Sequence, residues 1–279
     1  MKVITEPTVT VIAKQVFLGH PDYEIPIDGD DATKIGSFAA KGCYDSFGGD
    51  GRSNEANQRQ VIEQEHGSVL EHVNFTLFIE GVTRGLTLEM NRHRPFAVSQ
   101  RSTRYTAEED AAIVLEPFYA DLFISRRWRR VAPDTWVGGN MVDMMDSYML
   151  AGKPGDELMF DFLKQAEMAF DSYIRQVKYL EKMNPLKLEG FHLRKWARGK
   201  ARNILPHALE TRVTYTGNLR AWRWFIEARS NPAAEPEIRR LADRVLTTLR
   251  KEAPLYFEDF EQTEIYDGIP VWTPKHSKV

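Results

Sequence analysis

Four arginines crowd into one short segment of the chain. Arg92, Arg94, Arg101 and Arg104 fall within the 13-residue window RHRPFAVSQRSTR, which contains no carboxylate. A guanidinium group stays charged, and its planar fork binds phosphate through paired hydrogen bonds. Neutral hydrogen-bonding side chains alternate with the arginines, namely Ser99, Gln100, Ser102 and Thr103. The segment indicates either a site for a phosphorylated heterocycle or a solvated basic surface paired with acids from elsewhere.

A second group of polar residues lies in TGNLRAWRWFIEARS, residues 216–230. Asn218 is placed to cap a predicted helix, with Arg220 in its first turn and Arg229 nine positions later. The free N–H groups and positive dipole end of a helix N-terminus attract anions. The alternative is a helix whose arginines are ordinary exposed residues over an apolar core. In that alternative the exposed set is Arg220, Arg223 and Arg229, and the core is Leu219, Trp222 and Ile226.

Histidines beside a glutamate in EHGSVLEHVNF raise the question of a metal site. His66, Glu71 and His72 have the spacing H-x4-E-H, which differs from the i, i+4 histidine pair of a zinc-protease helix. The chain has one cysteine, so a thiolate-rich zinc site and an internal disulfide framework are excluded. We expect no bound metal. A metal-dependent hydrolase using His66, His72 and His93 is an alternative from a different class.

Cys43 is the only candidate thiol nucleophile. It lies in a predicted helix beside Ala39, Ala40 and Tyr44, with no histidine near it in sequence. A thiol in such surroundings is typically a small apolar residue of the interior. We therefore predict that Cys43 is buried and inert.

The overall charge argues against a general nucleic-acid binder. The 279 residues include 37 Lys and Arg against 40 Asp and Glu, a formal net charge of −3, whereas such binders are strongly basic. A nucleic-acid-binding module using the Arg92–Arg104 cluster and Trp128 remains the other alternative. No apolar run approaches the ~20 residues of a membrane span, and the first residues show no signal-peptide core. We expect no nucleic-acid or membrane partner and a cytoplasmic location, which for a viral protein is the cytoplasm of the host.

Hydrophobic periodicity places these groups on a mixture of helices and strands. Period-2 alternation predicts strands over 73–80 and 209–216, and short strands within 1–14. Period-3.6 patterns and caps predict helices over 31–47, 54–65, 83–92, 156–183, 186–200, 219–230 and 234–251. Residues 107–155 read as an irregular insertion with one short helix near 139–150. Strands and helices do not alternate strictly, so an α+β class is expected.

The arginine cluster also carries a known signature. Arg92-His93-Arg94, then seven residues, then Ser102 resembles the R-H-R-x7-S motif of the flavin-dependent thymidylate synthases (ThyX-type). Three further segments resemble elements of that family in the same order. They are a His-x-Ser/Thr and Glu-His segment at 66–80, an Arg-x-x-Leu-Pro element at 201–206, and an Asn-x-Arg helix at 216–230.

The resemblance implies a single-domain α+β fold over residues 1–279, with a central, mostly antiparallel sheet and long helices. It implies a homotetramer that holds FAD tightly at subunit interfaces and uses no metal. The implied reaction converts dUMP to dTMP, with 5,10-methylenetetrahydrofolate as carbon donor and NADPH as reductant of the flavin. No enzyme cysteine takes part, so activation of the uracil ring has to be electrostatic.

The resemblance also implies roles for individual residues. The FAD contacts would be Ser68, Arg92, His93, Arg94, Gln100, Asn218, Leu219, Arg220 and Trp224. Trp224 stands where the family often has His or Asn, and its indole could stack on the flavin. The dUMP contacts would be Glu89, Arg92, Gln100, Arg101, Ser102, Thr103, Arg104, Arg202 and Arg229. Arg229 would be the catalytic residue, which stabilises negative charge on the N3/O2 edge of the uracil.

Overall fold

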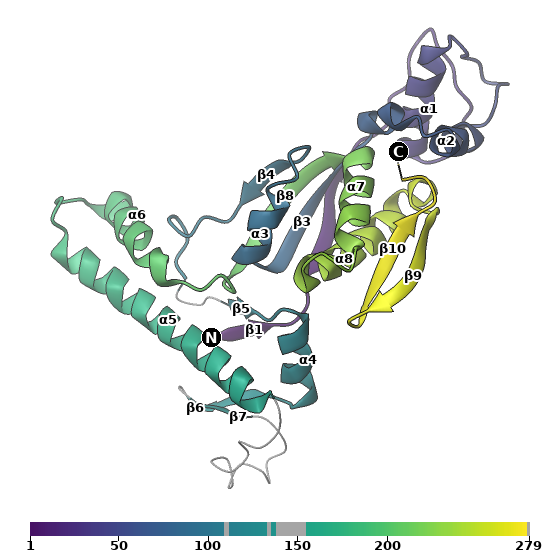
Figure 1. Cartoon of the computed structure of the whole chain (residues 1–279). Helices are drawn as coiled ribbons and strands as arrows, with labels where there is room; N and C mark the ends of the chain where they lie inside the picture. The colour runs from purple at the N-terminus through teal and green to yellow at the C-terminus, as the bar shows by residue number, and fades with distance from the viewer. Residues whose placement is uncertain (109–111, 133–134, 138–154, 278–279) are drawn as a thin grey trace. The chain divides into compact units, whose positions relative to one another are not determined.

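The computed structural model of the chain describes residues 1–108, 112–132, 135–137 and 155–277 (Figure 1). The chain divides into two compact units, which we describe separately. The first, here called the sheet unit, comprises Pro7–Glu80, Leu86–Ser99 and Arg212–Val279. The second, here called the long-helix unit, comprises Met1–Glu6, Gly81–Gly85 and Gln100–Thr211.

A four-stranded sheet with the order β2-β3-β8-β4 forms the centre of the sheet unit. The strands are β2 (Thr8–Lys14), β3 (Asn74–Thr83), β8 (Glu210–Asn218) and β4 (Ala97–Gln100). β2 and β3 are antiparallel, with Val9 opposite Ile79. The alternating residues Phe75, Leu77 and Ile79 are buried, as a strand with one face on a core requires. The strands predicted over 73–80 and 209–216 are confirmed.

Two helices that follow β8 pack together in the same unit (Figure 1). α7 (Leu219–Ser230) coincides with the helix predicted over 219–230, and α8 (Pro236–Glu252) begins with proline in its first turn. Asn218 caps α7, because its Oδ1 accepts from the Ala221 N–H at 2.8 Å. Both helices also pack against β10 (Ile269–Pro274).

Short helices precede and follow β3. They are α1 (Asp31–Cys43), α2 (Asn54–Glu63), the 3-10 helix η1 (Gly67–His72) and α3 (Arg84–Met90). Asp30 and Ser53 cap α1 and α2. The prediction that Cys43 is buried is wrong: the residue is exposed. α1 ends at Cys43 rather than at 47, so no further helical turn covers the thiol, which donates to the Ala39 carbonyl at 3.4 Å.

The C-terminal part of the sheet unit is a hairpin that the hydrophobic pattern did not predict. β9 (Phe260–Tyr266) pairs antiparallel with β10 (Ile269–Pro274) after the short helix η4 (Pro254–Tyr256). β9 is exposed after its first residue, so it lacks the alternation that marks a half-buried strand. Its turn did carry a signal: Asp267 and Gly268 both have positive φ, of 51° and 70°, and Asp-Gly is a favoured two-residue hairpin turn.

The buried Arg223 joins this hairpin to α7. Its side chain is 2% exposed and binds Asp259 in a fork, with Nη1–Oδ1 at 2.6 Å and Nη2–Oδ2 at 2.8 Å. Nη2 also donates to the His276 carbonyl at 3.0 Å. Arg223 is therefore not one of the exposed helix residues that the simpler interpretation of α7 assumed. Its charge is neutralised by a residue 36 positions away.

The long-helix unit is built on α5 (Asp156–Met183) and α6 (Gly190–Ala201), which pack together (Figure 1). α5 coincides with the predicted helix. Its apolar stripe is buried at Met159, Leu163, Ala166, Phe170, Tyr173 and Val177. Tyr173 and Val177 pack against Ala197 and Ala201 of α6, and the chain then continues into the 3-10 helix η3 (Arg202–Ile204).

The described part of 107–155 contains more regular structure than expected. β5 (Ala112–Val114) pairs parallel with β1 (Lys2–Ile4), and α4 (Pro117–Ser125) packs against α5. β6 (Arg129–Ala132) and β7 (Thr135–Val137) pair antiparallel. The short helix predicted near 139–150 lies outside the described residues. No helix in the described ranges is long and apolar enough to cross a membrane.

Candidate active site

The predicted catalytic arginine contacts the histidine of the R-H-R motif. Nε of Arg229, near the end of α7, donates to Nε2 of His93 at 2.8 Å. The turn that ends α3 places the histidine there, because the His93 N–H donates to the Met90 carbonyl at 3.0 Å. His93 is 3% exposed, and its ring lies among those of Trp224 and Phe225, 4.7 and 5.4 Å between centroids.

His93 is neutral in this environment. Burial, and then the charge of Arg229, lower the pKa of His93 from 6.5 to about 4. Because Nε2 accepts from Arg229, the single ring proton resides on Nδ1. Nδ1 is buried and has no hydrogen-bond partner among the described residues. The site therefore contains a buried N–H donor that this part of the chain leaves unsatisfied.

Glu89 is the second residue that holds Arg229. Its Oε2 lies 3.4 Å from Nη1 of Arg229, and the two side chains are 35% and 24% exposed. Glu89 lies in the last turn of α3, one turn before His93. The guanidinium is thus held on two sides, through Nε and Nη1. Nη2 has no hydrogen-bond partner within the described ranges.

Trp224 extends this cluster to the surface. Its side chain is 47% exposed, and it follows Arg220 by four residues, which places both on one face of α7. Its indole packs against His93 with the rings tilted by 56°. The sheet unit thus brings Glu89, His93, Trp224 and Arg229 together around one end of α7.

The other end of α7 carries the remaining predicted residues of that helix. The Leu219 side chain is fully buried, and its N–H donates to the Val73 carbonyl at 2.8 Å. Arg220 is exposed and bonds Glu71 through Nη1–Oε1 at 2.6 Å. Glu71 lies on η1, which packs against α7 and also carries the exposed Ser68. In the first turn of α7, the N–H groups of Leu219 and Ala221 are therefore already bound, by the Val73 carbonyl and by Asn218 Oδ1, and the exposed Arg220 guanidinium lies beside them.

Arg92 and Arg94 flank the buried His93 and are both exposed. Successive side chains point to opposite sides of this turn. His93 packs inward among aromatic rings, whereas Arg92 and Arg94 point to solvent. Neither arginine has an acidic partner in the part of the chain that the structure describes. Two uncompensated guanidinium groups therefore project from the same turn that holds His93.

In the long-helix unit, Arg101 is already neutralised by the protein. Its guanidinium lies 2.9 Å from Glu108 and 3.5 Å from Glu210, and it donates to the Ala107 carbonyl. Burial raises the pKa of Glu108, and the charge and hydrogen bond of Arg101 partly offset this rise. Gln100 donates to Thr211 Oγ1 at 3.3 Å. This network orders the loop that carries the second half of the arginine cluster.

Thr103 and Arg202 meet in the same unit, although 99 residues separate them. Nη1 of Arg202 donates to Thr103 Oγ1 at 3.4 Å, so the Arg-x-x-Leu-Pro element lies against the segment Ser102-Thr103-Arg104, here called the S-x-R segment. The Ser102 hydroxyl accepts from the Arg104 N–H at 3.3 Å, and Arg104 itself is exposed. Burial, together with the charges of Arg202 and Arg101, lowers the pKa of Arg84. This region therefore carries a local excess of positive charge.

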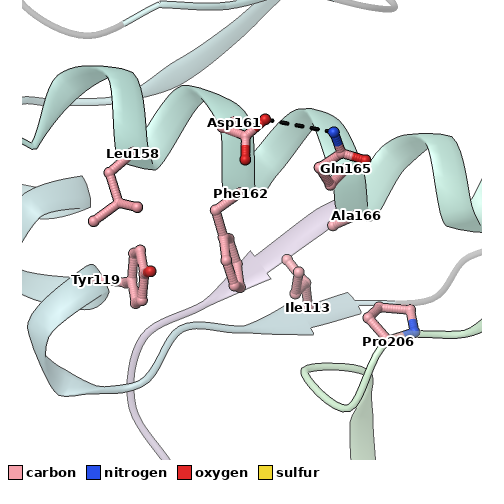
Figure 2. Close-up of a pocket in the computed structure, with 8 residues that line it drawn as sticks. All are labelled: Ile113, Tyr119, Leu158, Asp161, Phe162, Gln165, Ala166 and Pro206. Atoms are coloured by element: carbon pink, nitrogen blue, oxygen red, sulfur yellow. Dashed lines mark hydrogen bonds between the residues drawn. The ribbon is translucent and has the colours of Figure 1, made fainter.

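A separate pocket of about 240 Å³ lies between α4, α5 and β5 (Figure 2). The rings of Tyr119 and Phe162 stack there at 4.8 Å, and Gln165 Nε2 donates to Asp161 Oδ1 at 3.4 Å. None of the predicted site residues lines this pocket. In the described ranges, no group of three or more His, Cys, Asp or Glu residues is arranged to hold a metal ion.

The sequence motifs did not predict several residues that contact the candidate site residues or the loop that carries them. Glu108 and Glu210 neutralise Arg101, and Arg198 donates to the Tyr105 carbonyl at 2.8 Å. A local signal existed for Glu108, since a run of acids begins four residues after Arg104, the last arginine of the cluster. No local signal exists for Glu210, which lies in a distant strand.

Comparison with known proteins identifies the family. The family described as Thymidylate synthase complementing protein (Thy1) matches residues 27–255 of the chain. The flavin-dependent thymidylate synthase of Mycobacteroides abscessus is 34% identical over 266 residues, which cover 94% of this chain and 93% of that protein. The enzyme of the same name from Mycobacterium tuberculosis is 35% identical over 268 residues, with coverage of 95% and 94%.

Solved structures agree at the level of the fold. The UMP/dUMP methylase PolB from Streptomyces cacaoi, solved with 5-Br UMP, aligns with a TM-score of 0.56 at 20% identity over 92% of this chain and 95% of that chain. Thymidylate synthase X from Helicobacter pylori, solved with FAD and dUMP, aligns with a TM-score of 0.53 at 19% identity, with coverage of 91% and 98%. Together with the R-H-R-x7-S motif and the family match over most of the sequence, these findings show that the chain belongs to the flavin-dependent thymidylate synthase family.

Proposed function

We propose that this chain converts dUMP to dTMP by reductive methylation, with 5,10-methylenetetrahydrofolate as the carbon donor and NADPH as the reductant of a tightly bound FAD. The observation that carries the proposal is the position of Arg229, held between His93 and Glu89 at distances of 2.8 and 3.4 Å. Family membership supplies the reaction, and the geometry supplies a preorganised charge that can drive it.

Arg229 activates the uracil ring in this proposal. Its remaining N–H groups donate to the N3/O2 edge of the uracil and stabilise the negative charge that makes C5 nucleophilic. A donor that is already oriented costs no reorganisation during the reaction, which is why such groups contribute several kcal/mol. His93 keeps this arrangement because its pKa of about 4 leaves it neutral near pH 7, where it accepts from Arg229 instead of repelling it.

The S-x-R segment (Ser102-Thr103-Arg104) and Arg202 hold the dUMP phosphate. Among these residues, Arg104 and Arg202 are the exposed cations, whereas Arg101 is engaged by Glu108 and Glu210. We therefore assign Arg101 the task of ordering the loop, and assign the phosphate to the exposed pair and to neighbouring hydroxyl and amide groups. The dUMP set implied by the resemblance is Glu89, Arg92, Gln100, Arg101, Ser102, Thr103, Arg104, Arg202 and Arg229, and within this set we propose that Arg101 acts through the loop that it orders.

The residues around α7 fit a flavin dinucleotide. A buried N–H at His93 lacks a partner among the described residues, an indole lies beside it, and exposed guanidinium groups flank both. Such a set suits an aromatic ring system joined to a pyrophosphate. The proposed FAD contacts are Ser68, Arg92, His93, Arg94, Gln100, Asn218, Leu219, Arg220 and Trp224. When bound and reduced, FAD supplies the hydride that completes the methyl group, a chemistry that belongs to the cofactor.

A homotetramer in the cytoplasm completes the proposal. Several of the groups that would contact FAD lie on open surface, including Arg220 and Trp224, which is 47% exposed. A second copy of the chain would cover this surface and exclude water from the charges that act on the uracil. Sedimentation of the purified protein with and without FAD tests the assembly.

The test of the function combines colour with product. The purified protein should be yellow, should bleach when NADPH is added, and should form dTMP only when dUMP and methylenetetrahydrofolate are both present. Omission of each component in turn provides the controls. A colourless protein that gains no flavin absorbance from added FAD would contradict the proposal.

A further inference from the structure

One face of α6 carries positive charge that the proposed site does not use. Between Glu189 and Glu210 the chain contains no Asp or Glu, yet Arg194, Lys195 and Arg198 lie in this stretch on one side of α6, and Lys200 lies on another side. None of these four has an acidic partner within the described ranges. Charges left uncompensated on one helix attract anions over a Debye length of about 8–10 Å.

Two aromatic rings lie at the start of this basic face. Tyr105 and Phe191 stack with their centroids 5.8 Å apart and their planes 18° apart, and the side chains are 51% and 50% exposed. Lys195 Nζ lies 4.7 Å from the centre of the Tyr105 ring, and Arg198 donates to the Tyr105 carbonyl at 2.8 Å. The rings are therefore an exposed apolar surface bordered by cations and fixed to α6.

The cations continue from the rings in a row. Phe191, Lys195 and Arg198 follow one another at intervals of three or four residues, which places them along one side of α6, and Arg202 continues this spacing at the start of η3. From Lys195 to Arg202 the row extends about 10 Å along the axis. A row of single charges matches an extended chain that carries repeated carboxylates, whereas a compact phosphate group needs donors that converge on one point.

We propose that this face of α6 binds the p-aminobenzoyl-oligoglutamate tail of the folate co-substrate. The benzoyl ring stacks on the Tyr105–Phe191 pair, and the glutamyl carboxylates lie along Arg194, Lys195 and Arg198. The row ends at Arg202, which donates to Thr103 of the loop assigned to dUMP. The inference rests on the proposed function, since that function requires a folate.

Direct binding of the tail alone tests the proposal. The probe is p-aminobenzoyl-pentaglutamate, which lacks the pterin, titrated calorimetrically into the full-length protein at low and moderate salt. The double variant Arg194→Gln/Lys195→Gln should weaken binding by about five- to tenfold, as expected for two exposed ion pairs, and added salt should weaken binding to the wild type. Lys164→Gln is the matched control, because Lys164 also lies over an aromatic ring, that of Phe160 on α5, at 5.8 Å. That variant should bind the probe like the wild type.

Three results would overturn the inference. They are no binding of the probe, equal weakening by Lys164→Gln, and Lys195-dependent binding of 2′-phospho-ADP-ribose or an oligothymidylate in place of the tail. Circular dichroism of each variant verifies that the fold is retained. Formation of dTMP is measured separately, so an inactive protein that still binds the probe would contradict the proposed function and leave the tail site standing.

Discussion

Replacing Arg229 by lysine separates charge from geometry at the proposed catalytic position. Arginine holds His93 through Nε at 2.8 Å and Glu89 through Nη1 at 3.4 Å, and retains Nη2 for a ligand. A lysine has one ammonium group on a flexible stem, so it cannot reach both partners and still present a donor in a fixed direction. Arg229→Lys therefore keeps the positive charge and removes the preorganised fork.

The expected loss follows from that geometry. Removing one oriented donor from a site where charge develops typically lowers kcat by about 10²–10³-fold. We expect a decrease in this range for dTMP formation under saturating dUMP and folate. Flavin absorbance should remain, because the other proposed FAD contacts are intact. Stopped-flow bleaching by NADPH should also remain close to the wild-type rate.

The matched control is Arg212→Lys on β8, an exposed arginine that lies 3.3 Å from Glu80 and outside the proposed site. It should retain wild-type turnover. Near-normal dTMP formation by folded, yellow Arg229→Lys would refute the assignment of uracil activation to this fork. Loss of flavin from the same variant would show that Arg229 acts on cofactor binding instead.

Three further predictions concern other groups. Cys43→Ser should retain nearly full dTMP formation, because the thiol is exposed at the end of α1 and is assigned no step; complete loss would restore a thiol mechanism. Asp259→Ala leaves the buried Arg223 cation without its carboxylate, so urea denaturation should show a loss of about 3–5 kcal/mol in unfolding free energy; a loss under 1 kcal/mol would show that the pair is not structural. The pKa of His93 is about 4 in the folded chain against 6.5 ordinarily. The lowered pKa contributes stability, at most about 3 kcal/mol, that is fully present above pH 6.5 and is lost as the pH falls through about 4. His93→Gln should lack this part of the acid sensitivity, and an unchanged profile would contradict the neutral, buried histidine.

Local patterns predicted the helices well where the pattern was complete. α5 and α7 begin and end at the expected residues, because an uninterrupted apolar stripe or a capping asparagine marks them. The β9–β10 hairpin was missed because β9 is mostly exposed and has no apolar alternation. The Asp267-Gly268 turn is its one local sequence signal.

In the site, too, local sequence predicted the residue types, whereas contacts between distant residues could not be predicted. The R-H-R-x7-S motif predicted which arginines and which histidine belong to the site, since their types and spacing lie in one segment. It could not reveal that His93 accepts from Arg229, because the two residues are 136 positions apart. Nor could it distinguish Arg101, which Glu108 and Glu210 neutralise, from the exposed Arg104.

The sequence by itself determined the family, the periods of the main helices and strands, and the supply of guanidinium groups for anionic ligands. These are properties of residue type and local spacing, and they hold without knowledge of distant partners. The tertiary structure alone decided which of those charges are already compensated. It buried Arg223 against Asp259, exposed Cys43, and left Arg92, Arg94 and Arg104 without acidic partners among the described residues. The physical reason is that burial and ion pairing depend on what distant segments place next to a side chain, and so does the pKa of a residue such as His93.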